Sequence, residues 1–426
     1  MSEKSAASPI HWLKGQLKTQ GAIQRELLEA IQKRSVSPYA YVKPFIKAAA
    51  GVGEPPVGST PYKVVYTRGK MRLLHYESPN RKYLTPILFV YSLINRYYIL
   101  DFLPGRSLID YMRHQGFDVY AVDWGVPGDA EAKLGWEDYL GGTLVNAVRW
   151  ARRTSGAQDV TLYGYCMGGT MALAYAALYP EGVRNFVAQA VPVDFHQGGI
   201  FTEWTKPSRF NVDAMVDAFG NVPVEMMESG FSMMAPVQRA TKWLEVFKKV
   251  DDPAFVTTFL GMEHWASDNI PFPGGVYRQY IKDCYQQNNF CQGKMVVGGT
   301  RVDLSHIKCP LLNVLADKDT IAPAESSLPL MDLISSTDKE VKRFKTGHIG
   351  LSTSSKGPKE VWPQIAAWIA KRSELLPQEI HHDDDVMEGD FGNDTDEAAT
   401  ELLDGIADEM AASPLPRTEP PHSPQG

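Results

Sequence analysis

Apolar and polar residues follow a strand-and-helix alternation through the middle of the chain. Two short runs, YKVVYTRG and MRLLHYE, predict a pair of strands joined at Arg68-Gly69. PILFVYS has the length of a buried strand, and SLIDYMRHQGFDVYAVDWG predicts a helix that stops at Gly116 before another strand. YLGGTLVNAVRWARRTSG and DVTLYG repeat the helix and the strand. This order predicts an α/β fold with a mostly parallel central sheet and helices on both faces.

The alternation breaks after VRNFVAQAVPVDF, which predicts a strand ending near Asp194. Residues 195–300 are rich in Met, Phe, Trp and Gly and show helical patches without clear strands. CPLLNVLADKDTIAP and EVKRFKTGHIG restore the strand-and-loop pattern, and KEVWPQIAAWIAKRSELL predicts a closing helix. We therefore expect a core in two parts, 61–194 and 301–376. A cap or lid subdomain over 195–300 would be inserted between them and exclude water.

Both ends of the chain differ from this core. In 1–60 one helix is predicted around Ile23 to Lys33, and we interpret the segment as an appendage packed on the core, with a partner surface as the alternative. From 377 to 426 the chain is acidic or Pro-rich, which predicts a disordered tail. A short apolar stripe there leaves open a helix that forms on binding a partner: Leu402, Leu403, Ile406 and Met410.

Composition and charge narrow the class of protein. The 426 residues are 44% hydrophobic, enough for a sizeable core, and carry a net charge of −7. Residues 378–426 include 14 acidic residues and one arginine, so they hold −13 of this charge and leave +6 on the rest. A mildly basic body suits an anionic ligand such as a phosphorylated coenzyme. Nothing resembles a basic run interleaved with aromatics, so nucleic acid is not expected as a partner.

Cysteine usage and hydropathy bear on the compartment. The four cysteines have the spacing of neither a disulfide framework nor a zinc site, which favours a reducing compartment. The N-terminal MSEKSAASPIHWLKGQL lacks the apolar stretch of a signal peptide. The most apolar run is interrupted by Asn95, Arg96 and Asp101, so it is too polar for a membrane span. We expect a soluble, cytoplasmic protein.

The stretch VTLYGYCMGGTMAL carries the candidate chemistry. A strand, a sharp turn and a helix match the G-x-S-x-G nucleophile elbow of α/β-hydrolases, with Cys166 in place of the serine. Gly164 and Gly168 flank Cys166 where a side chain would crowd the strained turn. The alternative is a structural cysteine in a Gly-rich turn between strand and helix.

An elbow of this kind needs an acid and a histidine further along the chain, in that order. NVLADKDTIAP offers Asp317 and Asp319 at the end of a predicted strand, and position alone leaves both open. His348 in KTGHIG also follows a predicted strand. The other histidines are less well placed in the sequence to act with Cys166. His196 follows the strand expected to end near Asp194, whereas His264 and His306 are interpreted as packing or surface residues.

Several stretches together carry a resemblance to a known family: VYSLINRYYILDF, DVYAVDWG, GYCMGG, AVPVDF, FPGGVYRQY, VGGTRVDLSHIKCPLL, DTIAP and GHIG. Over roughly residues 61–372 the chain resembles the polyhydroxyalkanoate synthases, in particular the short catalytic subunit of the two-component type. The resemblance implies an α/β-hydrolase fold with Cys166 as nucleophile and His348 as base. It implies Asp319, not Asp317, as the acid. Thr320 stands where the family usually has His, so fine-tuning by that neighbour would be absent while the acid role survives.

An oxyanion hole is expected beside the nucleophile. The backbone N–H of Met167, the residue after Cys166, is the first donor. The second would come from the segment LINRYY, with Ile94 as the best single choice. Asp123 and Trp124 of DWG look like signature residues of the family, and either a structural or a functional role fits them.

Sulfur suits acyl transfer better than hydrolysis. Exchange between two thioesters is nearly isoenergetic, and a thiolate is a better nucleophile than a hydroxyl near neutral pH. The resemblance implies a synthase that polymerises (R)-3-hydroxyacyl-CoA, by analogy the short-chain 3-hydroxybutyryl-CoA, and releases coenzyme A. The alternatives are a cysteine-elbow hydrolase (a thioesterase, esterase or intracellular depolymerase) and a non-catalytic binding subunit of the same fold.

The same resemblance implies the surroundings of the enzyme. Its partners would be the acyl-CoA, the growing polyester and a small non-catalytic synthase subunit, in a homodimer or hetero-oligomer. No cofactor beyond the coenzyme A of the substrate and no metal is expected. The protein would act in the cytoplasm at polyester granules. The acidic tail does not belong to the family pattern.

Overall fold

The computed structural model describes residues 51, 53–234, 246 and 248–377. The helix predicted around Ile23 to Lys33 and the acidic tail lie outside the described residues. The predictions for these two segments therefore stay predictions.

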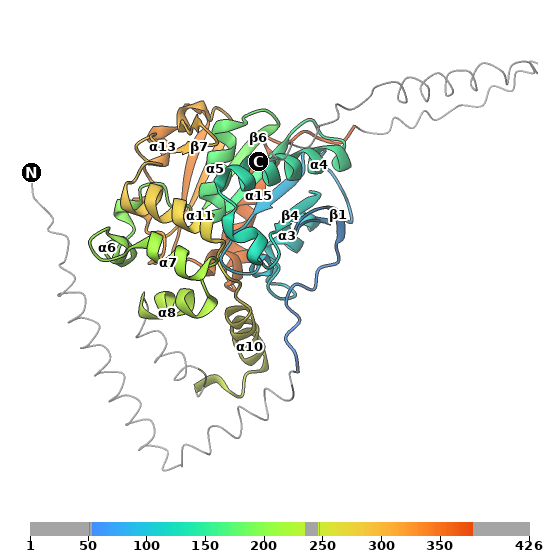
Figure 1. Ribbon diagram of the computed structural model, residues 1–426. Helices are drawn as coiled ribbons and strands as arrows, with labels where there is room; N and C mark the ends of the chain where they lie inside the picture. Colours follow the sequence, from blue (N-terminus) through green and yellow to red (C-terminus); the bar gives the residue numbers. More distant parts are fainter. Residues whose placement is uncertain (1–50, 52, 235–245, 247, 378–426) are drawn as a thin grey trace, which may run out of the picture. The chain divides into compact units, whose positions relative to one another are not determined.

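An eight-stranded sheet forms the centre of the described chain (Figure 1). Its first two pairings are antiparallel and the others are parallel, which confirms the predicted sheet and the predicted strand pair at its edge. The strands, in their order across the sheet, are β1 (Lys63–Arg68), β2 (Met71–Tyr76), β4 (Val119–Asp123), β3 (Ile87–Val90), β5 (Val160–Tyr165), β6 (Val183–Gln189), β9 (Leu311–Ala316) and β10 (Lys339–Phe344).

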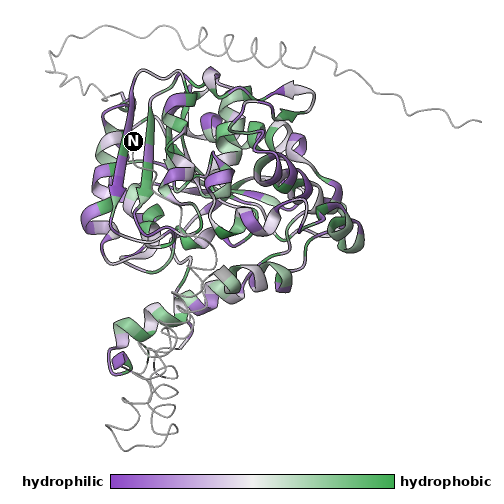
Figure 2. Cartoon of the chain, turned by 90° about the vertical axis from the view of Figure 1, so that its left-hand side faces the viewer, coloured by the Kyte–Doolittle hydropathy of each residue, from purple (hydrophilic) through white to green (hydrophobic). Residues whose placement is uncertain are grey.

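Helices cover both faces of the sheet, as predicted. Side chains alternate along β3: Ile87 and Phe89 join one buried apolar cluster with α3 and α15, whereas Leu88 and Val90 join another with α4 and α5. The strands inside the sheet are accordingly buried along their length, and Figure 2 shows a largely green strand beside a largely purple one. The helices of the core are α3 (Leu108–His114), α4 (Val145–Ser155), α5 (Met167–Leu178), α12 (Ala324–Ser327), α13 (Leu330–Leu333), α14 (Gly350–Thr353) and α15 (Trp362–Ala370).

Local sequence explains where α3 begins and ends. The Ser107 side chain accepts a hydrogen bond from the Asp110 N–H, which caps the start of the helix. Gly116 follows its end with φ of 101°, a conformation that glycine adopts without strain. The predicted stop at Gly116 is thus confirmed.

The strand predicted to end near Asp194 is shorter in the structure. β6 ends at Gln189, and Ala190 has a positive φ of 51° that takes the chain out of the sheet. Asp194 instead caps the 3-10 helix η4 (Phe195–Gln197) by accepting from the His196 N–H. The prediction ran five residues too long because the apolar pattern continues through residues that are buried but not in a strand.

The described part of 195–300 is mostly helical, with a two-residue strand β7 (Val296–Val297) paired to β8 (Thr300–Arg301) near its end. Figure 1 shows α8 and α10 on one side of the body, away from α4. The longer helices of the described part of 195–300 are α6 (Ile200–Thr205), α7 (Val212–Phe219), α8 (Val224–Met234), α10 (Pro253–Ser267), α11 (Gly274–Gln279) and the π-helix η5 (Tyr280–Gln286). The domain boundaries expected from the sequence stay predictions.

Short irregular helices complete the description. They are η1 (Tyr97–Ile99), η2 (Asp129–Lys133), the π-helices η3 (Asp138–Leu144) and η7 (Gly357–Val361), and η6 (Leu304–His306). In the described ranges, none of the helices combines the length and apolarity needed to cross a bilayer.

Candidate active site

Cys166 stands at a strained turn between β5 and α5. Its φ of 55° and ψ of −133° lie outside the regions that non-glycine residues ordinarily adopt. Strain of this kind persists only where the surrounding structure holds it, and it is typical of functional sites. The predicted strand, sharp turn and helix are therefore all present.

Three glycines permit this turn by close packing. A Cβ on Gly164 would lie 2.4 Å from the Gly169 Cα, and one on Gly168 would lie 2.4 Å from the Tyr91 carbonyl. A Cβ on Gly169 would lie 2.1 Å from Val191 Cγ2. Sequence reasoning singled out Gly164 and Gly168 only. The need for Gly169 depends on Val191, which lies beyond the end of β6.

His348 and Asp319 form a buried pair. The Asp319 Oδ2 lies 2.7 Å from His348 Nδ1, and Asp319 Oδ1 accepts from the N–H groups of Ile321 (2.9 Å) and Ala322 (2.8 Å). The Tyr165 hydroxyl donates to the His348 carbonyl at 3.1 Å. The Asp319 side chain is fully buried, so these bonds fix its position.

Asp317, the other aspartate that position left open, does not contact this pair. Its Oδ1 lies 2.9 Å from Arg343 Nε in a partly exposed ion pair. Because the two aspartates are only two residues apart, this difference comes from the turn that follows β9. The geometry brings Asp319, not Asp317, to His348.

The surroundings of His348 raise its pKa to about 10. Burial alone lowers this pKa, since it disfavours the charged ring. The negative charges of Cys166 and Asp319, and side-chain hydrogen bonds with both, outweigh the effect of burial. The site therefore favours the protonated form of the His348 ring.

The two expected oxyanion donors face the same cavity as Cys166. Met167 is the first residue of α5, so its N–H has no acceptor within the helix. Ile94 also lines the cavity, in the loop that follows β3. Trp124 braces this loop, because its Nε1–H donates to the Tyr91 carbonyl at 2.8 Å.

Asp123 contacts the edge of the sheet and not the cavity. Its Oδ2 pairs with Arg72 at 2.5 Å, and its Oδ1 accepts from the Gly125 N–H. Trp124 likewise contacts a loop of the core. These contacts favour a structural role for Asp123 and Trp124 over a functional one.

The cavity above Cys166 measures about 630 Å³. One wall comes from the core, with Tyr91, Tyr165, His348 and Thr320 among its residues. The opposite wall comes from 201–285 and is mostly aromatic or apolar: Phe201, Met227, Phe231, Trp265, Phe272, Tyr277, Tyr280, Ile281 and Tyr285. A largely apolar pocket with few convergent polar groups is typical of a ligand site.

Sequence reasoning missed the tyrosines of this cavity. Tyr280 and Tyr285 stand in or just beyond the family-like stretch FPGGVYRQY, which could have directed attention to them. His196 is exposed and lies outside the cavity lining, and the His306 ring contacts the Ala177 carbonyl. His264 packs near the Tyr98 ring. No cluster of three or more metal-ligating side chains occurs within the described residues.

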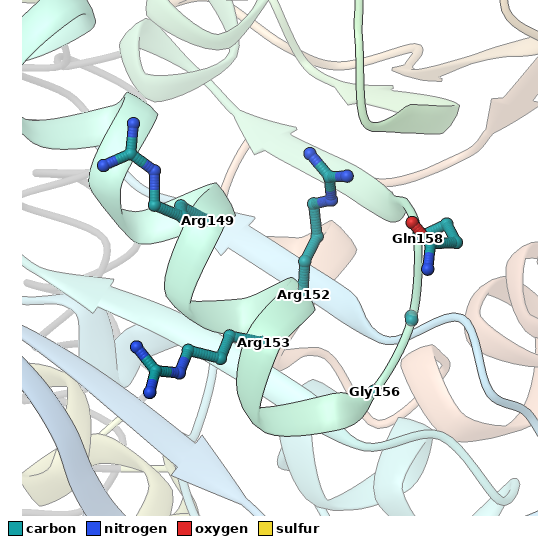
Figure 3. Close-up of a pocket in the computed structure, with 6 residues that line it drawn as sticks. Arg149, Arg152, Arg153, Gly156 and Gln158 are labelled. Atoms are coloured by element: carbon teal, nitrogen blue, oxygen red, sulfur yellow. The ribbon is translucent and has the colours of Figure 1, made fainter. Parts of the chain in front are cut away.

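A second hollow, of about 390 Å³, lies at the C-terminal end of α4 (Figure 3). Arg149, Arg152 and Arg153 line it together with Gly156, Ala157 and Gln158. The chain passes from this hollow into the start of β5, whereas Cys166 follows the end of β5. The arginines therefore lie at the other end of the parallel strands from Cys166 and take no part in the site.

The fold and the elbow define an α/β-hydrolase-fold protein, and residues 85–354 match the family described as alpha/beta hydrolase fold. A soluble variant of monoglyceride lipase from Saccharomyces cerevisiae superposes with a TM-score of 0.52. It shares 16% identity, and the match covers 76% of this chain and 100% of that one, so the likeness concerns the fold alone.

Sequence comparison identifies the family within this fold. The chain is 44% identical over 329 residues to the "Poly(3-hydroxyalkanoate) polymerase subunit PhaC" of Haloferax mediterranei, covering 76% of this chain and 67% of that protein. It is 38% identical over 320 residues to the protein of the same name from Allochromatium vinosum, covering 74% and 90%. Residues 22–112 match the family described as poly-beta-hydroxybutyrate polymerase (PhaC) N-terminus. The chain belongs to the PhaC family of poly(3-hydroxyalkanoate) polymerase subunits.

Proposed function

We propose that this chain is a polyhydroxyalkanoate synthase that polymerises (R)-3-hydroxyacyl-CoA through an acyl-Cys166 intermediate. One observation carries the proposal: in a PhaC-family chain, a strained elbow cysteine lines the same cavity as His348, whose ring contacts the buried Asp319. A nucleophile, a base and a group that orients the base are the parts that covalent acyl transfer requires.

In the first half-reaction, His348 takes the proton of the Cys166 thiol, and the thiolate attacks the carbonyl carbon of the acyl-CoA thioester. The bond between that carbon and the coenzyme A sulfur breaks, and His348 returns its proton to the departing sulfur. Asp319 keeps the His348 ring oriented and stabilises the imidazolium, supported by the 2.7 Å contact between them. The Met167 N–H and a donor near Ile94 hold the oxyanion.

In the second half-reaction, His348 takes the proton of a 3-hydroxyl group, whose oxygen attacks the Cys166 thioester. The new ester forms as the carbon–sulfur bond breaks, and the proton on His348 restores the thiol. The net change is one ester bond formed and one molecule of coenzyme A released. Water would compete for the same thioester, and the aromatic wall of the cavity supports its exclusion.

The surroundings follow from the same proposal. The substrate is short-chain 3-hydroxybutyryl-CoA, no cofactor beyond its coenzyme A takes part, and the product accumulates as granules to which the enzyme is bound in the cytoplasm. A small non-catalytic subunit completes the synthase, as a homodimer or hetero-oligomer. The relatives from Haloferax mediterranei and Allochromatium vinosum, both named as subunits, support an assembly of this kind.

A cysteine-elbow hydrolase is the competing function, supported by the fold alone. The test follows coenzyme A release from (R)-3-hydroxybutyryl-CoA and collects insoluble polymer from the same tube, with and without a candidate second subunit. We expect polymer and coenzyme A with the wild type and neither with Cys166→Ala. Cys291→Ala, whose side chain lies outside the cavity lining, is the matched control and should behave as the wild type. Release with only free hydroxy acid would identify a thioesterase and overturn the proposal.

A further inference from the structure

Two tyrosines stand together in the cavity wall that faces Cys166. Tyr280 and Tyr285 both line the cavity and both belong to the π-helix η5. Their ring centroids are 5.5 Å apart and the rings are nearly perpendicular, at 84°. A π-helical turn of this kind frequently marks a functional site, because it brings side chains together that an α-helix would separate.

Aromatic neighbours hold this pair rigidly. Phe195 meets the Tyr285 ring edge to face at 4.8 Å and the Tyr280 ring at 5.5 Å. Phe201 meets Tyr285 at 4.9 Å, so Tyr285 is packed from two sides. Edge-to-face packing fixes the ring planes and therefore the direction of each hydroxyl group.

The two hydroxyls also interact with each other and with the nucleophile. Burial raises the pKa of both tyrosines, and the nearby negative charge of Cys166 raises both further. A side-chain hydrogen bond between the two residues raises the pKa of Tyr280 and lowers that of Tyr285, as expected when Tyr280 donates to the Tyr285 oxygen. Two hydroxyls that share one hydrogen bond retain one O–H between them. Among the described residues, the remaining O–H has no other protein acceptor. It lies in a cavity whose wall is mostly apolar here, with Glu228, Glu263, Ser267 and Asn269 as its polar members.

An uncommitted donor in a largely apolar cavity is suited to bind an oxygen of the ligand, since burial leaves it costly without a partner. Resting on the function proposed above, we propose that the Tyr280–Tyr285 pair determines specificity by donating a hydrogen bond to the 3-oxygen of the acyl group. Both forms of that oxygen, the hydroxyl of a monomer and the ester oxygen of a chain, accept such a bond. A plain acyl group lacks the oxygen and would leave the donor unpaired.

The test compares two substrates that differ only at this oxygen. Enzyme in excess is mixed with (R)-3-hydroxybutyryl-CoA or butyryl-CoA, the reaction is quenched, and free coenzyme A is separated and quantified by chromatography. The wild type should acylate Cys166 faster from the hydroxyacyl substrate. Tyr285→Phe should slow that substrate by about 10-fold, the value of one neutral hydrogen bond, and change butyryl-CoA by less than about 2-fold. Tyr280→Phe should also lower the ratio of the rate with (R)-3-hydroxybutyryl-CoA to the rate with butyryl-CoA, but by a smaller factor than Tyr285→Phe.

Controls separate this specificity role from a structural one. Tyr139→Phe removes the hydroxyl of another buried tyrosine, outside the cavity, and should leave both rates unchanged. Equal losses on the two substrates in Tyr285→Phe and Tyr280→Phe, or no loss in either, would overturn the specificity proposal. Failure of the proposed function looks different: the wild type would form no acyl-Cys166 from either substrate, as judged by mass spectrometry.

Discussion

The two walls of the cavity are built in different ways. On the core wall, polar groups are held by directional bonds: Asp319 accepts from two backbone N–H groups and from His348. On the wall formed by 201–285, aromatic rings pack on one another, as Phe195 and Phe201 do on Tyr285. The first wall is suited to moving a proton at a fixed place, and the second to enclosing an acyl chain in a dry space.

The two walls should also differ in their tolerance of single substitutions. The bonds of the core wall depend on single atoms, so one substitution there should abolish activity. The packed rings of the other wall share their contacts among several residues, so single changes there should alter preference or stability by smaller amounts. The following predictions test this contrast, in order of decreasing effect.

Replacing Asp319 should have the largest effect. Asp319→Asn keeps the size of the side chain but removes the charge that orients and stabilises the His348 imidazolium, so the rate of coenzyme A release should fall by about 100-fold to 10,000-fold. Asp317→Asn, two residues away on the exposed Arg343 pair, is the matched control and should stay within about 2-fold of the wild type. Similar losses in both variants would contradict the assignment of Asp319.

Gly169→Ala should destabilise the fold, because the added methyl group has no room. The added Cβ would lie 2.1 Å from Val191 Cγ2, and a β-branched valine cannot easily move away. Overpacking of this kind costs about 1–3 kcal/mol in the free energy of unfolding, measured by denaturant titration.

Two further variants check the cause of that loss. Gly169→Ala combined with Val191→Ala should regain part of the lost stability, because the obstructing methyl group is gone. Gly230→Ala, in α8 with no atom within 4 Å of the new methyl group, should be neutral or slightly stabilising. No recovery in the double variant would contradict the packing explanation.

The stability contributed by His348 should depend on pH. Its pKa in the folded protein, about 10, exceeds the ordinary value of 6.5, so protonation favours the folded state. This contribution is fully present below about pH 6.5 and is lost as the pH rises through about 10. The difference in unfolding free energy between the wild type and His348→Gln should therefore narrow over that window.

His264→Gln serves as the control, because His264 packs near the Tyr98 ring and does not belong to the group formed by Cys166, Asp319 and His348. In Cys166→Ala, the His348 pKa measured by NMR titration should fall, because one of the two negative charges that raise it is removed. An unchanged pKa would mean that Asp319 alone accounts for the shift.

The smallest effect is expected at the rim between the walls. Asp268 accepts from the Tyr98 hydroxyl at 2.7 Å and pairs with Arg96 at 3.2 Å, but its side chain is 43% exposed. Solvent screening should limit the loss in Asp268→Asn to about 1 kcal/mol or less by thermal denaturation. A loss several times larger would show that this rim holds the two walls together more strongly than its exposure implies.

Much of the core wall could be predicted from the sequence. The strand, turn and helix around Cys166 are encoded within fourteen consecutive residues, because the glycines and the apolar runs act locally. The choice between Asp317 and Asp319 required either the family resemblance or the structure, since both aspartates follow the same strand. The role of His348 required the same support. The end of β6 was misjudged, because apolar residues after Gln189 are buried although they lie outside the strand.

By itself the sequence determined the α/β fold and the elbow, because strand and helix periodicity and glycine turns are local properties of the chain. Only the tertiary structure decided which residues meet above Cys166. Tyr280 and Tyr285 are more than a hundred residues from it, and they reach the cavity because η5 packs against α6 and η4. The need for Gly169 likewise depends on Val191 of another segment. Contacts of this kind are set by the packing of whole elements, which no local pattern specifies.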